Sequence, residues 1–183
     1  LGPHPVARFV NNYVASWQVF FKRFDAAIAR YQASLLWYDK DESALHCLAN
    51  LYAQAKQPFT DISLALKLFQ QLIEQYPSKA AYPFNMGYVL QTQDQHNHAI
   101  AMFERATALD QNLDRAWYGM ALSHMALSQW SQAIIALQHN TRLQPMSPYG
   151  WYQTAIAQAH MGDWDGATQT GKHLMSFEPK FAR

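Results

Sequence analysis

The sequence predicts an all-α fold in which five antiparallel helix pairs stack in a row. Two ladders of small residues, with a spacing close to 34, predict this fold. Members of the first ladder are separated by 38, 34, 34 and 34 positions: Ala27, Ala65, Ala99, Ala133 and Ala167. Members of the second are separated by 34, 38, 34 and 34 positions: Ala15, Ala49, Gly87, Ala121 and Ala155. A fixed period of this length indicates a repeat architecture.

Small residues in these ladders let the two helices of a pair approach closely. Ala121 and Ala133 are such a pair, because a packed interior leaves no spare volume for a larger side chain. Proline disfavours helical geometry in the residue before it, so Pro145 and Pro179 are expected to end the second helices of their pairs. Each pair then buries the apolar face of the next pair.

The first two repeats follow a lead-in at residues 1–7. The first repeat spans residues 8–41, and its register is set by Val14, Ala15, Phe24, Ala27 and Tyr31. The second spans residues 42–79 and holds four extra positions, which we place between Lys56 and Asp61. Within this insertion, Thr60 or Asp61 is the expected N-cap of the following helix.

The last three repeats occupy residues 80–113, 114–147 and 148–181. The fourth repeat is the clearest, because Trp117 and Trp130 supply large rings that fill the wedge between adjacent helices. In the fifth repeat, which ends at Phe181, Gly171 falls inside a helix at a cost of about 1 kcal/mol relative to alanine.

The period, the small residues and the terminal prolines together resemble the tetratricopeptide repeat, which is a helix–turn–helix unit. The resemblance covers residues 8–181. It implies a right-handed α-solenoid that forms a single domain over residues 8–183. It also implies that the first helix of every pair lines a concave groove, which in this family receives extended or helical peptides.

The places that the resemblance assigns to this groove hold aromatic, apolar and weakly basic side chains, and no acidic one. The predicted groove residues are Asn12, His46, Asn50, Phe84, Asn85, Tyr88, Arg115, Tyr118, Leu122, Met125, Tyr152 and Ile156. Such a lining suits the anchoring of side chains together with a few polar contacts to a peptide backbone. For Tyr118 and Tyr152, packing between repeats is the alternative role.

Some members of the family bind a C-terminal carboxylate through two lysines, two asparagines and an arginine. Asn50 and Asn85 fall at the two asparagine places, and Arg115 falls at one lysine place. His46 takes the other lysine place and Gly119 takes the arginine place. The resemblance therefore implies a possible carboxylate clamp, with chance agreement as the alternative.

The sequence indicates no catalytic, cofactor or metal site. Cys47 is alone, which excludes an internal disulfide and a zinc site of several thiolates. His96 and His98 have no third ligand at a useful spacing, and His139 and His173 occupy one place in successive repeats. A formal net charge of +1 disfavours nucleic-acid binding through phosphate contacts. No run approaches the roughly 18 apolar residues of a membrane span.

These features predict a non-catalytic protein-interaction module that binds a partner peptide or protein segment in its concave groove, as an adaptor or assembly scaffold. Two alternatives stay open: a chaperone for a secreted or assembling protein, and the recruiting or regulatory segment of a larger enzyme. The chain is also a candidate homodimer, in which Leu174, Met175 and Phe177, expected to be exposed in the last repeat, would form the interface. The sequence leaves the compartment undetermined and favours the cytoplasm over the periplasm.

Overall fold

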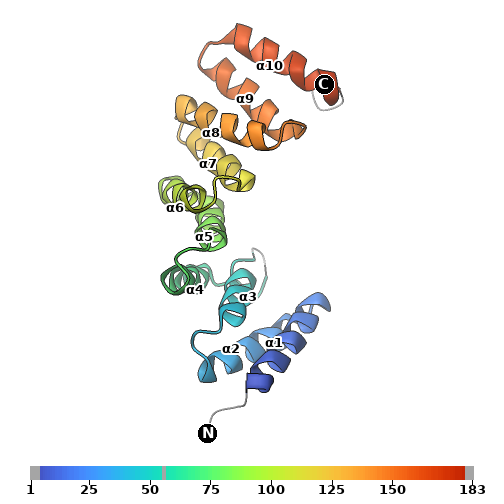
Figure 1. Cartoon of the computed structure of the whole chain (residues 1–183), viewed down its shortest axis with the longest axis vertical. Coiled ribbons are helices and arrows are strands. Elements are labelled where there is room, and N and C mark those ends of the chain that lie inside the picture. The colour runs from blue at the N-terminus through green and yellow to red at the C-terminus, as the bar shows by residue number, and fades with distance from the viewer. Residues whose placement is uncertain (1–4, 55–56, 180–183) are drawn as a thin grey trace. The chain divides into compact units, whose positions relative to one another are not determined.

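The computed structural model of the chain describes residues 5–54 and 57–179, which form ten α-helices and no strand (Figure 1). The helices are α1 (Pro5–Phe20), α2 (Phe24–Trp37), α3 (Glu42–Tyr52), α4 (Ile62–Gln75), α5 (Ala81–Thr92), α6 (His96–Leu109), α7 (Asp114–Ala126), α8 (Trp130–Leu143), α9 (Pro148–His160) and α10 (Trp164–Phe177). Residues 1–4 of the predicted lead-in, Lys56 of the predicted insertion and Phe181 lie outside the described residues.

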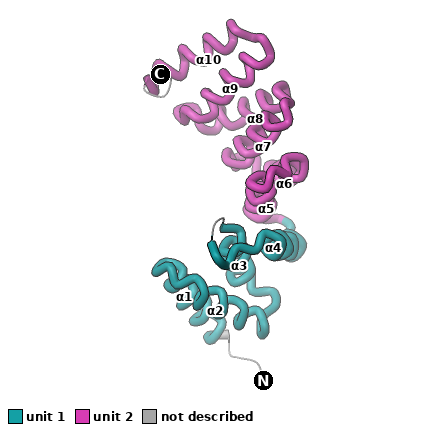
Figure 2. Tube along the Cα trace, turned by 180° about the vertical axis from the view of Figure 1, so that it is seen from behind, with its two compact units in different colours: residues 1–77 teal, residues 78–183 magenta. Residues whose placement is uncertain are grey.

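The helices fall into two compact units, residues 1–77 and residues 78–183 (Figure 2). Unit 1 contains the pairs α1–α2 and α3–α4, and unit 2 contains the pairs α5–α6, α7–α8 and α9–α10. The helices of each pair pack against each other, and within a unit the second helix of one pair packs against the first helix of the next. The predicted all-α fold of helix pairs is confirmed, whereas the single domain over residues 8–183 stays a prediction.

The small-residue ladders lie where the helices of a pair meet. Their fully buried members, with 0% of the residue exposed, are Ala15, Ala27, Ala49, Ala65, Ala99, Ala121 and Ala133. Gly87 is also buried, whereas Ala155 and Ala167 in the last pair are half-buried. Close approach of the two helices therefore explains why these places hold residues with at most one side-chain carbon.

The predicted ends of the second helices are confirmed. α8 ends at Leu143, two residues before Pro145, and α10 ends at Phe177, two residues before Pro179. The repeat symmetry extends to polar contacts, because the indole N–H of Trp117 donates to the Gln111 carbonyl at 3.0 Å. The corresponding indole of Trp151 donates to the Pro145 carbonyl at 2.8 Å.

The paired histidines also follow the repeat. The ring of His139 stacks on Trp117 with centroids 4.1 Å apart, and the ring of His173 meets Trp151 edge-on at 4.4 Å. Both histidines therefore have the same structural role in successive repeats, as their spacing predicts. Leu174 does not fit its prediction: it is only 2% exposed, so it belongs to the core and not to an exposed dimer surface.

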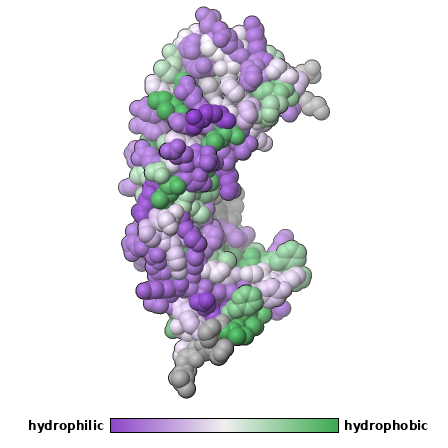
Figure 3. Space-filling view, in the orientation of Figure 1, coloured by the Kyte–Doolittle hydropathy of each residue, from purple (hydrophilic) through white to green (hydrophobic). Residues whose placement is uncertain are grey.

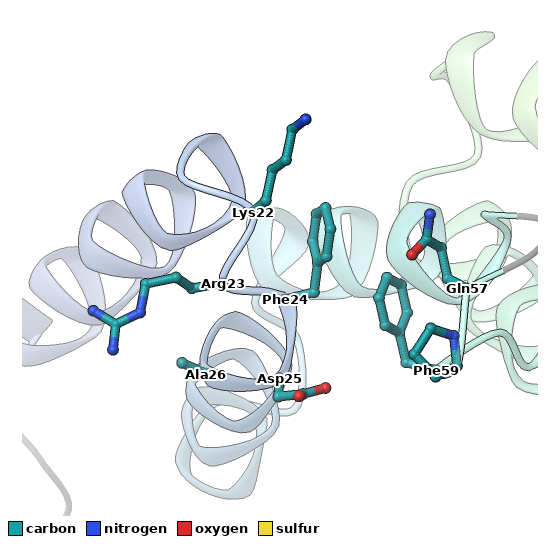
Figure 4. A pocket seen from close by; sticks show the side chains of 8 residues that line it. Lys22, Arg23, Phe24, Asp25, Ala26, Gln57 and Phe59 are labelled. Carbon is teal, nitrogen blue, oxygen red and sulfur yellow. The ribbon is translucent and has the colours of Figure 1, made fainter.

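In the insertion of the second repeat, Asp61 is the N-cap of α4, and Thr60 is not. The Asp61 carboxylate accepts from the Leu64 N–H at 2.9 Å, and this bond lowers the pKa of Asp61. The Thr60 hydroxyl instead donates to the carbonyl of Gln54 and closes the loop. Next to it, the ring of Phe59 packs against Phe24 at the start of α2, with centroids 5.1 Å apart (Figure 4).

Four turns between the two helices of a pair place a residue in the left-handed region. These residues are Lys22, Asp94, Ser128 and Gly162, with φ values of 58°, 57°, 58° and 80°. In the turn after α7, the N–H of Gln129 donates to the carbonyl of His124 at 2.8 Å. This bond and the left-handed residue before it form a Schellman motif, in which glycine is the favoured residue.

Replacing Ser128 with glycine is therefore expected to stabilise unit 2. A non-glycine residue in the left-handed region costs about 1–2 kcal/mol, and glycine removes this cost. Part of the gain is offset, because glycine has more conformational freedom in the unfolded chain. We expect the free energy of unfolding to rise by about 1 kcal/mol in a denaturant titration. The control Ser131→Gly, in the first turn of α8, should lower it by at most about 0.5 kcal/mol. A Ser128→Gly protein that unfolds at lower denaturant would contradict the assignment.

Candidate functional site

The predicted groove residues are distributed over the two units. Unit 1 holds Asn12 on α1, and His46 and Asn50 on α3. Unit 2 holds the other nine on α5, α7 and α9: Phe84, Asn85, Tyr88, Arg115, Tyr118, Leu122, Met125, Tyr152 and Ile156. All of them lie on the first helices of their pairs.

In unit 2, the first helices α5 and α7 are joined by one amide side chain. The Nε2 group of Gln91 on α5 donates to the carbonyl of Gly119 and to the hydroxyl of Ser123 on α7, both at 2.8 Å. A second link is electrostatic, because the guanidinium of Arg115 lies 5.2 Å from the centre of the Phe84 ring. A cation over an aromatic face is attracted by the ring, so Phe84 positions Arg115 at the surface.

Arg115 and Tyr118 line an open pocket of about 390 Å³ in unit 2. The other lining residues are Asp114, Asn140, Ser147 and Tyr149. The structure therefore brings two of the predicted groove residues together with a second tyrosine, which is 58% exposed. A concave surface with aromatic walls and a few polar groups is the usual form of a ligand site.

Tyr118 is half-buried, and its hydroxyl is hydrogen-bonded to the side chain of Gln153. Burial raises the pKa of the Tyr118 phenol, because the charged phenolate loses solvation. The hydroxyl therefore keeps its proton at neutral pH and remains available as a donor. Tyr152, on the next first helix, is 42% exposed.

Asn140 lies on the second helix α8, so the repeat pattern did not predict that it would line this pocket. It is 5% exposed, and its Nδ2 donates to the Asp114 carbonyl at 3.0 Å. A Cβ atom on Gly150 would lie 2.3 Å from the Asn140 Oδ1. Gly150 is thus the sequence feature that could have indicated the position of Asn140, because only glycine leaves room there for the amide.

In unit 1, the predicted groove residues make internal contacts. The Nδ2 of Asn12 donates to the Asp41 carboxylate at 2.8 Å, and the Nδ2 of Asn50 donates to the His46 carbonyl at 2.8 Å. Burial lowers the pKa of His46, so this ring is neutral at pH 7. Asn12 and Asp41 also line a pocket of unit 1, with Arg8, Phe9, Tyr13, Ser16 and Ser43.

These contacts bear on the carboxylate clamp. At Gly119, a Cβ atom would lie 2.7 Å from Cζ of the Phe103 ring, so an arginine has no room at this place. His46 stands where the clamp has a lysine, but its neutral ring supplies no positive charge at pH 7. Arg115 is the remaining cation among the five clamp places.

No group of three or more His, Cys, Asp or Glu side chains in residues 5–54 and 57–179 is placed to hold a metal ion. Within the same residues, no helix combines the length and apolar character that crossing a membrane requires.

The comparisons with known proteins agree with the repeat architecture. A family model described as tetratricopeptide repeat matches residues 44–79. No curated protein matches the sequence. Among solved structures, a crystal structure of MamA is 21% identical, with a TM-score of 0.84, covering 96% of this chain and 94% of that one. MamA from Desulfovibrio magneticus RS-1 is 17% identical, with a TM-score of 0.83, covering 94% and 96%.

A third similar structure is YrrB, described as a TPR protein with an unusual peptide-binding site. It is 16% identical, with a TM-score of 0.78, and the match covers 94% of this chain and 88% of that one. At these identities the likeness concerns the fold, and it confirms the α-solenoid fold class that the repeat period predicts.

Proposed function

Because the chain is a tetratricopeptide-repeat protein built from repeated helix pairs, we propose that it is a protein-interaction module whose unit 2 binds an extended segment of a partner protein. Folds of this type generally serve as non-catalytic scaffolds for other proteins. YrrB, whose fold is similar, has a peptide-binding site, which supports the same class of ligand here.

The observation that supports this proposal most is the pocket at Arg115, Tyr118 and Tyr149. It offers a guanidinium, a protonated phenol that can donate, and a 58% exposed aromatic ring. Backbone carbonyls and carboxylates of a peptide accept hydrogen bonds from the first two groups, and the ring supplies apolar contact area at low entropic cost. A partner segment with a carboxylate beside an apolar side chain fits this set of groups.

The other predicted groove residues of unit 2 extend the proposed surface. Leu122 and Met125 continue along α7, and Ile156 and Tyr152 lie on α9. On α5, Tyr88 is 58% exposed. We assign these side chains to apolar contacts with the partner and the Arg115 pocket to its polar anchor.

Replacing Arg115 with alanine is expected to weaken partner binding about 10- to 100-fold, because a hydrogen bond to a charged group is worth about 1.5–3 kcal/mol. Tyr118→Phe, which removes only the hydroxyl, should weaken binding about 2- to 10-fold. The partner is first captured from native lysate, and its binding segment is then titrated calorimetrically against each variant.

The matched control is Arg105→Ala, since Arg105 is an exposed arginine on the second helix α6. This variant should bind like the wild type. If the Arg115 and Tyr118 variants also bind like the wild type while their helical content is unchanged, the pocket is not the binding site.

A further inference from the structure

One face of α1 in unit 1 exposes a continuous row of apolar side chains, which we call the α1 stripe. It consists of Phe9, Val10, Tyr13, Trp17 and Phe20 on the helix and Phe21 directly after it, and their exposed fractions lie between 47% and 74%. Hydrophobic surface is visible at α1 in the lower part of Figure 3. Single exposed apolar residues are ordinary, but a contiguous row of this size marks an interaction surface.

The rings of the stripe support one another along the helix. Phe9 and Tyr13 stack with centroids 6.4 Å apart, and Tyr13 meets Trp17 edge-on at 6.2 Å. Trp17 in turn stacks on Phe21 at 5.7 Å. Side chains that hold one another in place lose little conformational freedom when a partner covers them, so the surface is already organised for binding.

The spacing of the stripe indicates that its occupant is a helix. Val10, Tyr13, Trp17 and Phe20 follow one another at intervals of three, four and three residues. This is the seam spacing by which one helix packs along another. A flat surface such as a lipid bilayer imposes no such narrow seam.

The size of the stripe matches an interface between two copies of the chain. If each aromatic side chain offers about 200 Å², the exposed fractions of the stripe amount to about 600–700 Å² per copy. A stable protein interface of ordinary size buries about 800 Å² on each partner. A self-complementary pair of stripes with their nearest neighbours reaches this area without a further element.

The charges around α1 favour an antiparallel pair. α1 contains no acidic residue, and its single cation, Arg8, lies 3.9 Å from the Asp41 carboxylate and over the Tyr38 ring. The exposed cations Lys22 and Arg23 both follow its C-terminal end. A parallel pair would bring Lys22 and Arg23 of both copies together. An antiparallel pair instead places Lys22 level with Arg8 of the other copy, whose charge the Asp41 carboxylate partly offsets, and it opposes the two helix dipoles.

We propose that the α1 stripe is a homodimer interface in which two copies of α1 pack antiparallel, with Val10 of one copy opposite Phe20 of the other. The interface lies in unit 1 and does not depend on the partner site proposed for unit 2. Hydrophobic burial along the seam holds the two copies together.

The first test is sedimentation equilibrium of the full chain from 1 to 200 µM. The wild type should form dimers, and Trp17→Glu should raise the dimer dissociation constant at least about 100-fold, because it buries an unpaired charge in the seam. The matched control is Trp164→Glu, since Trp164 is 68% exposed on α10 in unit 2; it should dimerise like the wild type. A wild type that is monomeric at 200 µM, or a dimer that survives Trp17→Glu, overturns the proposal.

The second test fixes the orientation by oxidative cross-linking. A mixture of Val10→Cys and Phe20→Cys chains should form a disulfide between the two kinds of chain. Each variant alone should not cross-link, because ten residues along a helix separate its two cysteines by about 15 Å, beyond the reach of a disulfide. The wild type, which contains only Cys47, gives the background. Cross-linking of either variant with itself overturns the antiparallel arrangement.

A lipid surface is the rival occupant, and a third measurement tests it. The wild type and Trp17→Glu are sedimented with phosphatidylcholine vesicles containing phosphatidylserine. We expect neither protein to sediment with the vesicles. Wild-type binding that Trp17→Glu abolishes, together with a monomer in solution, would assign the stripe to lipid and overturn the dimer.

Discussion

Replacing Phe103 with alanine should destabilise unit 2 by about 3–5 kcal/mol, because the substitution empties the centre of a packed contact between three helices. Phe103 on α6 is 0% exposed. One edge of its ring lies against Gly87 of α5, where an added Cβ would be 2.9 Å from Cδ1 and Cε1. The tip of the ring lies against Gly119 of α7, where an added Cβ would be 2.7 Å from Cζ.

These two glycines form a slot for the Phe103 ring, and a side chain smaller than phenylalanine would leave part of this slot empty. The bonds that Gln91 makes to Gly119 and Ser123, both 2.8 Å long, tie α5 to α7 and so oppose the collapse of either helix onto an alanine at this place. The cavity therefore persists, and a persistent cavity gives the upper part of the range for a large-to-small substitution.

Hydrogen exchange followed by mass spectrometry can measure this effect on unit 2 alone. Peptides from α5 to α8 should lose protection in Phe103→Ala, while peptides from unit 1 keep theirs. The control is Leu109→Ala on the same helix. Leu109 is 40% exposed, so this substitution should lower the free energy of unfolding by only about 1 kcal/mol. If the α5 to α8 peptides are equally protected from exchange in Phe103→Ala and Leu109→Ala, Phe103 does not fill a slot that holds the three helices together.

A double substitution tests the slot itself. Gly119→Ala should cost about 1–3 kcal/mol in the wild type, because the new methyl group overlaps the Phe103 ring. In a Phe103→Leu background, the ring atom that it meets is absent, so the same substitution should cost less. A coupling energy of at least about 1 kcal/mol between the two sites is the expected sign of direct contact.

The helix pairs were predictable from the sequence because their cause is local and repeated. Each ladder alanine allows two neighbouring helices to approach, and Pro145 and Pro179 end the helices before them, so one repeat explains the next. Gly87 belonged to the same ladder, and its burial followed from its register. The period alone therefore predicted most of the architecture.

The candidate site was less predictable, because its features depend on contacts between helices that the repeat does not specify. Gly119 takes the arginine place of a clamp in the family pattern, yet here it makes room for Phe103. Asn140 reaches the Arg115 pocket only because Gly150 leaves space for its amide. The apolar spacing of α1 is that of a core helix in sequence, whereas its exposure became visible only in the folded chain.

The second large effect concerns Asp41, which joins three helices of unit 1. Asp41 is 4% exposed, and its Oδ2 accepts from Nδ2 of Asn12 on α1 at 2.8 Å and from the hydroxyl of Ser34 on α2 at 3.2 Å. Its Oδ1 accepts from the N–H of Ala44 at 3.2 Å and so caps α3. One carboxylate thus satisfies donors from α1, α2 and α3.

Asp41→Ala is expected to lower the free energy of unfolding of unit 1 by about 3 kcal/mol. Loss of an N-cap costs about 1 kcal/mol, and a buried donor left without an acceptor costs about 1–3 kcal/mol. Asp39→Ala is the control two residues away; the Asp39 side chain is exposed, and the bond from Gln71 goes to its backbone carbonyl, which the substitution keeps. Denaturant titration with hydrogen exchange of the α1 to α3 peptides measures both variants.

Asp41→Asn separates the charge from the hydrogen bonds. Asn12 Oδ1 is buried and has no hydrogen-bond partner among the described residues. If the Asn12 amide turns over, this oxygen can accept from the new amide at position 41, while the cap to Ala44 is kept. The turned amide then places its own Nδ2 where Oδ1 has no partner now, and the Ser34 hydroxyl loses its acceptor. The loss should therefore be about 1–2 kcal/mol, which is still below that of Asp41→Ala. A loss in Asp41→Asn as large as in Asp41→Ala would show that the negative charge, and not the hydrogen-bond geometry, holds the three helices together.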